Sequence, residues 1–354
     1  MINIISPINQ LGYGICSLNI VKALSKITDV ALWPISQPQV TNNEDADIIK
    51  LCLKNASLPD FNAPCLRIWH QHDMSQFVGG GEKIGFPIFE LDKFSAIEKH
   101  HLSHLDRIFV CSAWAKQVIL NNISIDENKV NVIPLGVDSS IFKPQGVNKN
   151  GPTVFLNCGK WEIRKGHDIL IDIFNIAFDI SDNVELWLLC DNPFLTKEET
   201  ENWYKKYYGS KLGSKIKIIP RLQTQEEVYS IMCQSDCGIF PSRAEGWNLE
   251  LLEMMSCGKH VITTGYSAHT EFCNENNAHI VPISSLEPAY DGKWFFKQGN
   301  WAQISNNELN LFVNHMKKIH NMKINNILSD NIGGIQTSQK FSWKNTAEQI
   351  LKYV

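Results

Sequence analysis

The 354-residue sequence lacks both a membrane-spanning segment and a secretory signal. No stretch of eighteen apolar residues occurs, and the first ten residues, MINIISPINQ, contain no basic segment followed by an apolar core. These absences predict a cytoplasmic protein. A CxxC pair is also missing, although the chain has ten cysteines, most of them inside apolar runs. This distribution is typical of reduced, buried thiols, so we expect neither disulfides nor a zinc site.

The sequence has little net charge, −4 at neutral pH. A value this small provides no overall attraction to nucleic acid or to anionic membranes, although a local patch can still provide one. The P-loop pattern GxxxxGK[ST] is absent, which argues against nucleotide hydrolysis of that type. Partners therefore have to be inferred from individual sites.

Short apolar runs rich in β-branched residues alternate with segments of helical periodicity along the chain. The first half predicts six strands: INIIS, DVALWPI, CLRIWH, IGFPIF, RIFVCS and VNVIPL. The second half predicts six more: TVFLNCG, VELWLLCD, IKIIPRL, CGIFPS, HVITTG and AHIVPI. Helices such as AWAKQVILNN and HDILIDIFNIAF lie between them. This alternation is typical of parallel sheets with crossover helices, so we predict an α/β protein with two doubly wound, Rossmann-like halves.

A polar segment with proline and glycine, residues 138–153, interrupts the alternation and is typical of a linker. We therefore predict an N-terminal domain over residues 1–145, a C-terminal domain over 146–335 and a final helix over 336–354. Ligands of doubly wound sheets bind at the carboxyl ends of the strands, which favours a site in a cleft between the domains. The aromatic-rich residues 284–304 fit neither half. They predict either a loop packed on the second domain or a lid that contacts an acceptor.

Three strand-to-helix turns have the composition of phosphate-binding loops. QLGYGICSLN contains Gly12 and Gly14, which would let backbone approach an anion, although a tight turn explains them equally well. NCGKWEIRKGHD places Lys160, Arg164 and Lys165 within six residues, enough positive charge for a diphosphate, with a solvated face as the alternative. PSRAEGWNLELLE ends a strand and begins a helix whose free N–H groups can hold a phosphate.

The third turn also carries carboxylates in an otherwise apolar helix, where an unpaired charge is costly. Glu245 and Glu253 are eight positions apart, at most roughly 12 Å along a helix, which spans the distance between a sugar and a ribose on either side of a diphosphate. Both carboxylates would accept hydrogen bonds from hydroxyl groups. Glu250 does not share this spacing, and we expect it to be an exposed or salt-bridged residue.

Together these residues resemble glycosyltransferase family four, whose members are retaining enzymes with the GT-B fold. The resemblance rests on the E-x7-E pattern within PSRAEGWNLELLEMMSCGKHVI, on the GKWEIRKG turn and on IPLGVDSSIFKP, and it is strongest over residues 112–272. It implies two Rossmann-like domains facing a central cleft, with the C-terminal helix packing back on the first domain. Lys160 stands where the family usually has arginine, and the segment 284–304 departs from the common pattern.

The resemblance implies a role for each matching residue. Glu245 would contact the donor sugar and Glu253 the ribose of the nucleotide, while Lys165 and Lys160 would hold the diphosphate. His72 would lie beside the reacting sugar and join Lys165 and Glu245 as a catalytic residue, with His70 as the competing choice. Further donor contacts fall on Gly14, Arg221, Gly246, Trp247, Asn248 and Leu249, and acceptor contacts on Gly12, Asp73 and Glu90.

The resemblance predicts a metal-independent, retaining glycosyltransferase that moves a hexose or pentose from a nucleotide-diphosphate sugar to an acceptor hydroxyl, without a further cofactor. A glycan or a lipid-linked sugar is the expected acceptor. One alternative is transfer to a hydroxymethylated base in viral DNA, with the basic, aromatic segment 203–217 on the phosphates. A non-catalytic nucleotide-sugar-binding protein, or an epimerase of the same fold, would also have these motifs. Peripheral membrane contact through EKHHLSHL stays open, and the sequence does not indicate an oligomeric state.

Overall fold

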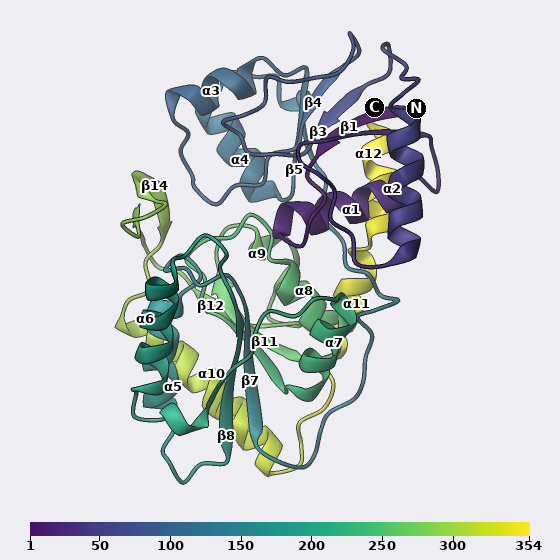
Figure 1. Ribbon diagram of the computed structural model, residues 1–354. Helices are drawn as coiled ribbons and strands as arrows, with labels where there is room; N and C mark the ends of the chain where they lie inside the picture. Colours follow the sequence, from purple (N-terminus) through teal and green to yellow (C-terminus); the bar gives the residue numbers. More distant parts are fainter. The chain divides into compact units, whose positions relative to one another are not determined.

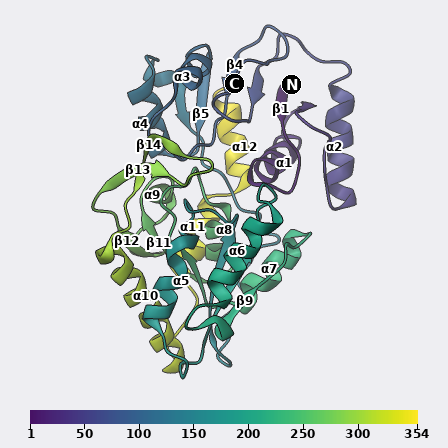
Figure 2. The ribbon, with the colours of Figure 1, turned by 60° about the vertical axis from the view of Figure 1, so that its left-hand side comes forward.

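The computed structural model describes residues 1–354, which divide into two compact units. Unit 1 consists of Met1–Gly136 and Phe341–Val354, and unit 2 consists of Val137–Lys340. Each unit contains one parallel six-stranded sheet with helices on both faces, as Figure 1 shows. Figure 2 shows the same layers after a rotation about the vertical axis. The predicted class, an α/β protein with two Rossmann-like domains, is confirmed.

The sheet of unit 1 has the strand order β2-β1-β3-β4-β5-β6, with parallel neighbours throughout. Its strands are β1 (Ile2–Ser6), β2 (Val30–Pro34), β3 (Cys65–Arg67), β4 (Lys83–Gly85), β5 (Arg107–Val110) and β6 (Val130–Val132). Its helices are α1 (Gly12–Leu24), α2 (Asn43–Asn55), α3 (Ala96–Ser103), α4 (Ala113–Asn122) and α12 (Trp343–Lys352), with a short 3₁₀ turn, η1 (Glu127–Lys129). Strand β1 is buried along its whole length, because helices cover both faces of the sheet.

The sheet of unit 2 has the strand order β12-β11-β10-β7-β8-β9, again with parallel neighbours. Its strands are β7 (Thr153–Gly159), β8 (Val184–Cys190), β9 (Ile216–Ile218), β10 (Cys237–Phe240), β11 (His260–Gly265) and β12 (His279–Pro282). Helices α5 (His167–Ala177), α6 (Lys197–Tyr208) and α10 (Asn306–Ile324) lie on one side of this sheet in Figure 1. Helices α7 (Gln225–Gln234), α8 (Leu249–Ser256) and α11 (Ile332–Lys340) lie on the other. The shorter elements are η2 (Gly213–Lys215) and α9 (His269–Phe272).

The aromatic-rich segment 284–304 forms an antiparallel hairpin of β13 (Leu286–Tyr290) and β14 (Phe296–Ala302), apart from the main sheet. One part of it is buried, since Ala289, Trp301 and Ala302 are almost inaccessible. Tyr290, Trp294 and Phe296 are exposed. The segment therefore combines a packed base with an exposed aromatic tip.

The last helix, α12, belongs to unit 1 although it follows unit 2 in the sequence. Its apolar residues Ala347 and Ile350 are buried, and α12 lies beside α1. The Thr346 hydroxyl donates a hydrogen bond to the Pro134 carbonyl at 2.8 Å. An amphipathic helix of this length needs such a partner surface, because isolated short helices are marginal in water.

Some elements differ from the sequence-based expectation. Helix α1 begins at Gly12, so the glycines of the predicted strand-to-helix turn QLGYGICSLN lie in the first turn of the helix itself. A Cβ at Gly14 would lie 2.2 Å from the Asn9 side-chain oxygen, which gives this glycine a packing role of its own. Helix α2 has no counterpart among the predicted helices. Only three of its thirteen residues are buried, and one of these is Asp45.

Candidate functional site

Two loops at the carboxyl ends of neighbouring strands form the candidate site in unit 2. Strands β7 and β10 are adjacent in the sheet, so the loops that follow them, residues 160–166 and 241–248, lie side by side. A backbone hydrogen bond joins the two loops, from Arg243 N–H to the Arg164 carbonyl at 2.7 Å. Both turns predicted to bind phosphate in this half of the chain therefore meet at one place.

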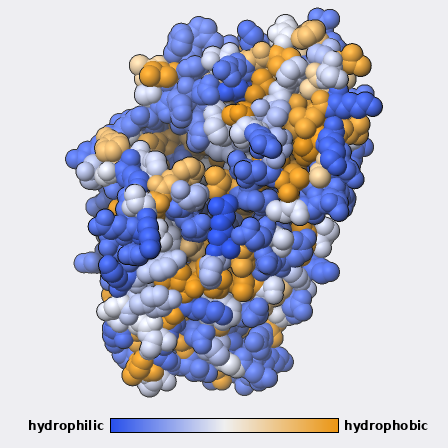
Figure 3. Space-filling view, viewed as in Figure 1, coloured by the Kyte–Doolittle hydropathy of each residue, from blue (hydrophilic) through white to orange (hydrophobic).

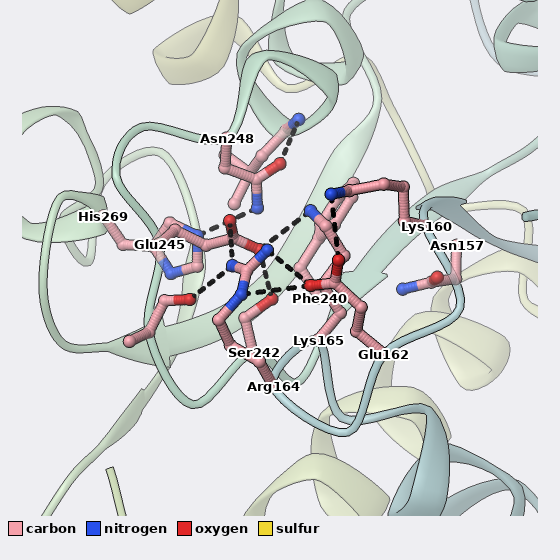
Figure 4. Close-up of polar contacts among 12 residues, drawn as sticks. Asn157, Lys160, Glu162, Arg164, Lys165, Phe240, Ser242, Glu245, Asn248 and His269 are labelled. Carbon is pink, nitrogen blue, oxygen red and sulfur yellow. Dashed lines mark hydrogen bonds and ion pairs between the residues drawn. The ribbon is translucent and has the colours of Figure 1, made fainter. Parts of the chain in front are cut away.

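Buried charged side chains connect these loops (Figure 4). The Glu245 carboxylate accepts hydrogen bonds from Lys165 Nζ at 2.9 Å and from Arg164 Nη1 at 2.7 Å. Arg164 also donates to Glu162 through Nε and Nη2, at 3.1 and 2.7 Å, so its guanidinium lies between the two carboxylates. Lys160, whose side chain is 40% exposed, pairs with the other Glu162 oxygen at 3.0 Å. We call these five side chains the charge network; its three cations and two carboxylates leave one net positive charge.

The network fixes the ionisation of its members. Burial opposes the charged form of Glu245, but the adjacent Arg164 and Lys165 cations outweigh it and hold the pKa of this carboxyl well below its usual range. Burial likewise acts against the charge on Lys165, yet the Glu245 carboxylate raises the pKa of Lys165 above its usual value. Both residues are therefore charged at neutral pH although each is less than 10% exposed.

The end of β7 is shaped for the lysine. Gly159 has φ of 145°, and a Cβ at this position would lie 2.9 Å from Lys165 Cδ. A side chain there would displace the lysine, and the backbone conformation is one that other residues rarely adopt. Glycine at the strand end thus allows the Lys165 side chain to lie against the backbone.

Helix α8 begins with an unusual cap. Asn248 has a left-handed backbone, with φ of 84°, and its side-chain oxygen accepts a hydrogen bond from Leu251 N–H at 3.2 Å. The Asn248 amide nitrogen lies 2.9 Å from His269 Nε2, and the His269 Nδ1 atom lies 3.1 Å from the Thr264 carbonyl. Burial lowers the pKa of His269 to about 4, so the ring is neutral at pH 7 and can accept from Asn248 while donating to Thr264.

Glu253 differs from Glu245 although both are buried. Glu253 lies in α8, is 8% exposed and has neither a hydrogen bond nor an ion pair through its side chain. Burial and the nearby Glu250 charge raise the pKa of Glu253 well above its usual value. The sequence predicts that Glu250 is exposed or salt-bridged. Glu250 is half-buried in the first turn of α8, and its charge also raises the pKa of Lys165 after the larger effects of burial and Glu245.

The other predicted donor residues of unit 2 differ in their burial. Gly246 and Trp247 are buried, and the Trp247 ring packs on Phe272 with centroids 4.8 Å apart, which leaves its backbone rather than its side chain for a ligand. Leu249 begins α8 and is half-buried. Arg221 follows β9, is exposed, and lies 3.7 Å from the Asp191 carboxylate.

Of the residues predicted in unit 1, Gly12 and Gly14 lie in the first turn of α1, and His72, Asp73 and Glu90 lie on loops. His72 is exposed, and its ring stacks on His70 at 5.3 Å between centroids. Asp73 pairs with the buried Arg67 at 2.9 Å, which gives this carboxylate a structural partner. Gly12 is exposed and Glu90 is half-buried. Gly14, assigned to the donor by the resemblance, belongs to α1 and so to unit 1.

Sequence reasoning missed several residues that organise these loops. In the sequence, Arg164 is one of three equivalent cations, and Glu162 lies in the same GKWEIRKG turn without an assigned role. Tyr13 is a further residue that the pattern does not mark; its hydroxyl donates to the Ile88 carbonyl at 2.7 Å and its ring lies 4.7 Å from His70. The alternation of Lys160, Glu162 and Arg164 in KWEIR is a usable signal, since it places opposite charges two residues apart.

Four lysines of the basic segment 203–217 make contacts within unit 2. Lys206 donates to the Asp168 carbonyl, Lys211 pairs with Asp179 at 2.6 Å, and Lys215 donates to the Asp182 carbonyl. Lys217 lies over the Trp187 ring at 4.3 Å. Lys205, Lys206, Lys211 and Lys217 are nevertheless exposed.

The structure contains neither a candidate metal centre nor a candidate membrane span. Residues 1–354 include no group of three or more His, Cys, Asp or Glu side chains arranged to hold a metal ion. None of the helices combines the length and the apolar character needed to cross a bilayer.

The chain is similar to known glycosyltransferases in sequence and in structure. Residues 152–289 match a family model described as glycosyl transferases group 1. An uncharacterized glycosyltransferase of Methanocaldococcus jannaschii is 28% identical over 246 residues, which cover 70% of this chain and 58% of that protein. The chain thus matches little more than half of that relative's length.

Solved structures show the same fold over nearly the whole chain. Sucrose-phosphate synthase from Thermosynechococcus elongatus matches with a TM-score of 0.71 and 15% identity, covering 99% of this chain and 97% of that one. Anabaena HepE in complex with UDP-glucose matches with a TM-score of 0.70 and 13% identity, covering 99% and 98%. The chain therefore has the GT-B fold, and its second unit carries the segment that is similar to group 1 glycosyltransferases.

Proposed function

We propose that this protein is a retaining glycosyltransferase that uses a nucleotide-diphosphate sugar. The observation that carries the proposal is the charge network at the carboxyl ends of β7 and β10, where Lys165 is buried and held by Glu245. The match of residues 152–289 to group 1 glycosyltransferases and the UDP-glucose bound to HepE support the same activity.

The diphosphate would bind at the cationic side of the network. Lys160 is the most accessible of the three cations, and Lys165 lies against the end of β7. The first backbone N–H groups of α8, beginning at Leu249, have no partner within the helix and favour an anion. A positive charge placed there stabilises the leaving diphosphate as the bond to the sugar breaks, which makes Lys165 a catalytic residue.

The two glutamates would bind hydroxyl groups at opposite ends of the donor. A carboxylate has about four lone-pair sites, and Glu245 uses three of them, on Lys165, Arg164 and Ser242. One site thus remains for a hydroxyl of the donor sugar. Glu253 has no partner in the protein, and hydroxyl groups of the ribose would satisfy this buried side chain.

The remaining roles belong to the same proposal. His72, or His70 beside it, would lie near the reacting sugar, and the leaving phosphate would take the proton of the acceptor hydroxyl. The acceptor would be a glycan or a lipid-linked sugar, contacted by Gly12, Asp73 and Glu90. We propose transfer without a metal ion, because lysine side chains can neutralise the diphosphate. A reducing, cytoplasmic location agrees with the ten free cysteines.

A thermal-shift screen tests the donor class. UDP-, GDP- and ADP-linked sugars are added separately to the full chain, and the unfolding temperature is measured against the protein alone. A ligand that binds only the folded state raises this temperature by mass action. We expect one nucleotide class to do so with and without a chelator. If none of these compounds stabilises the protein, the proposed function is wrong.

A further inference from the structure

Two exposed aromatic rings meet beside the charge network. Phe194 follows β8 and is 52% exposed, and Trp294 lies at the tip of the β13–β14 hairpin and is 45% exposed. Their centroids are 6.1 Å apart, with an interplanar angle of 78°. Large aromatic side chains are usually buried, and exposed ones gain hydrophobic stabilisation only when a ligand covers them. The pairing of two such rings from separate loops therefore indicates a binding surface.

The hairpin tip is held in a fixed conformation. Asp291 Oδ1 accepts hydrogen bonds from three successive backbone N–H groups, those of residues 293 to 295, at 2.7 to 2.9 Å. Lys293 pairs with Glu199 of α6 at 2.6 Å, and the Phe295 ring lies 5.5 Å from the buried Trp301. Trp294 is thus exposed on a rigid support, which reduces the entropy lost when a ligand binds.

The hairpin is also attached to the loop that carries Glu245. Arg243 forms a bidentate pair with Asp168 at 2.8 Å, and its guanidinium lies 5.8 Å from the Trp301 ring centre. The Arg243 carbonyl accepts a hydrogen bond from Ala302 N–H at 2.9 Å. The aromatic tip and the charge network therefore share one framework inside unit 2.

A cation joins the aromatic pair to the network directly. Lys160 Nζ lies 5.6 Å from the Phe194 ring centre while it pairs with Glu162. On the other side, Lys293 Nζ lies 5.3 Å from the Trp294 ring centre. The two rings are thus flanked by charged groups that can donate hydrogen bonds, and the surface continues from the proposed diphosphate position to the hairpin tip.

We propose that Phe194 and Trp294 form a carbohydrate-binding subsite that holds a pyranose ring of the acceptor glycan. A pyranose has C–H faces that pack on aromatic rings and a rim of hydroxyl groups that hydrogen-bond to charged side chains, which matches this combination of surfaces. The subsite rests on the proposed function, because its continuity with Lys160 is what makes the bound sugar an acceptor.

The composition of the surface favours a sugar over a lipid bilayer. An interfacial membrane anchor buries a broad apolar face, whereas here two rings are flanked by Lys160, Lys293 and Glu199. Figure 3 shows that hydrophilic atoms cover most of the face drawn there, with hydrophobic atoms in separate groups. A ligand with both apolar faces and hydroxyl groups suits such a mixed surface better than lipid chains do.

The test compares glycan binding by the full chain with binding by Trp294→Ala and Phe194→Ala variants. An array of immobilised mono- to trisaccharides, probed in the presence of UDP, selects the glycan, which is then titrated against each protein. Leu286→Ala is the matched control, because Leu286 lies on the same hairpin, is 46% exposed and belongs to no aromatic pair. We expect each aromatic variant to weaken glycan binding about tenfold or more, equivalent to about 1.4 kcal/mol, and the control to bind as the wild type.

Four results would contradict the subsite. Wild-type protein that binds no glycan on the array, or aromatic variants that bind as the wild type, would overturn it. A parallel loss of UDP affinity would make the pair a platform for the nucleotide base instead. Loss of binding to vesicles of anionic phospholipid, with glycan binding intact, would make it a membrane contact. If a nucleotide sugar still stabilises the wild-type protein, the proposed function stands in each of these cases and only the subsite fails.

Discussion

The two units carry their predicted site residues in different ways. In unit 2, Glu245, Arg164 and Lys165 are buried and bonded to one another across two loops. In unit 1, His72 is exposed on a loop, where its ring stacks on that of His70. The comparison indicates that one unit has a preorganised charged site, whereas the other presents accessible side chains that a ligand would have to order.

The largest effect should follow from breaking the charge network. Glu245→Gln leaves Arg164 and Lys165 buried with one carboxylate fewer, and removing one member of a buried ion pair typically costs about 3–5 kcal/mol. In urea unfolding of the full chain, the free energy of unfolding of unit 2 should therefore decrease by about this amount. Glu253→Gln is the control, because it removes a buried carboxyl without ion pairs and should change stability little. Equal stability of the two variants would show that the network does not hold the loops.

Substitution of His72 tests whether an exposed residue of unit 1 acts in catalysis without contributing to stability. His72→Ala should reduce sugar transfer by about 10²-fold, as expected for a positioned proton-transferring or hydrogen-bonding side chain, while leaving thermal stability and nucleotide binding at their wild-type values. His70→Ala separates the two candidates. If His70→Ala abolishes transfer and His72→Ala does not, the assignment moves to His70; unimpaired transfer by both variants removes the histidines from the mechanism.

Acid should destabilise unit 2 through its buried histidines. Burial lowers the pKa of both His167 and His269 to about 4, so the unfolded chain binds more protons than the folded one below pH 6.5. The contribution of each neutral, buried histidine to the free energy of unfolding is therefore complete above the unfolded pKa. It decreases as the pH drops, by about 2 kcal/mol for each histidine between pH 6.5 and 5. Denaturant titrations of wild type and His269→Gln measure this slope. An unchanged slope in the variant would show that His269 does not titrate as stated.

The smallest effect concerns Glu253. Burial and the Glu250 charge raise its pKa in the free protein, whereas ribose hydroxyl groups favour the ionised form. Binding of the nucleotide sugar should then release a proton and strengthen with rising pH, by up to about tenfold per pH unit below the pKa of Glu253. Calorimetry in buffers of different ionisation heat detects the proton. If nucleotide-sugar binding by the wild type and by Glu253→Gln has the same pH dependence, the ribose does not contact Glu253.

The sequence predicted the sheets well because their strands are buried on both faces and read as apolar runs. All twelve predicted strands overlap strands of the two sheets, and β7 and β1 have the predicted bounds. The hairpin at residues 286–302 could not be predicted in this way, because its exposed strands alternate irregularly and contain a register shift. Helix α2 was also missed. Only three of its residues are buried, so the helical spacing of its buried face is difficult to recognise in the sequence.

For the site, the sequence predicted which loops meet but not how their charges are arranged. The order of β7 and β10 in a doubly wound sheet brings Lys165 and Glu245 together. Arg164 pairs with Glu245, eighty-one residues away, and with Glu162, two residues away. Both contacts depend on side-chain directions, which spacing alone does not determine. The same limit applies to Glu250, because its position in the first turn of α8 places it near Lys165 rather than at an exposed surface.

The most direct test of the account measures release of nucleoside diphosphate from the nucleotide sugar that stabilises the protein. The wild type is compared with Lys165→Met, which keeps the length of the side chain and removes its charge. We expect release by the wild type and a decrease of about 10²-fold or more in the variant, whose circular dichroism should match that of the wild type. Release at the wild-type rate by the variant would contradict the claim that the charge network of unit 2 is the donor site.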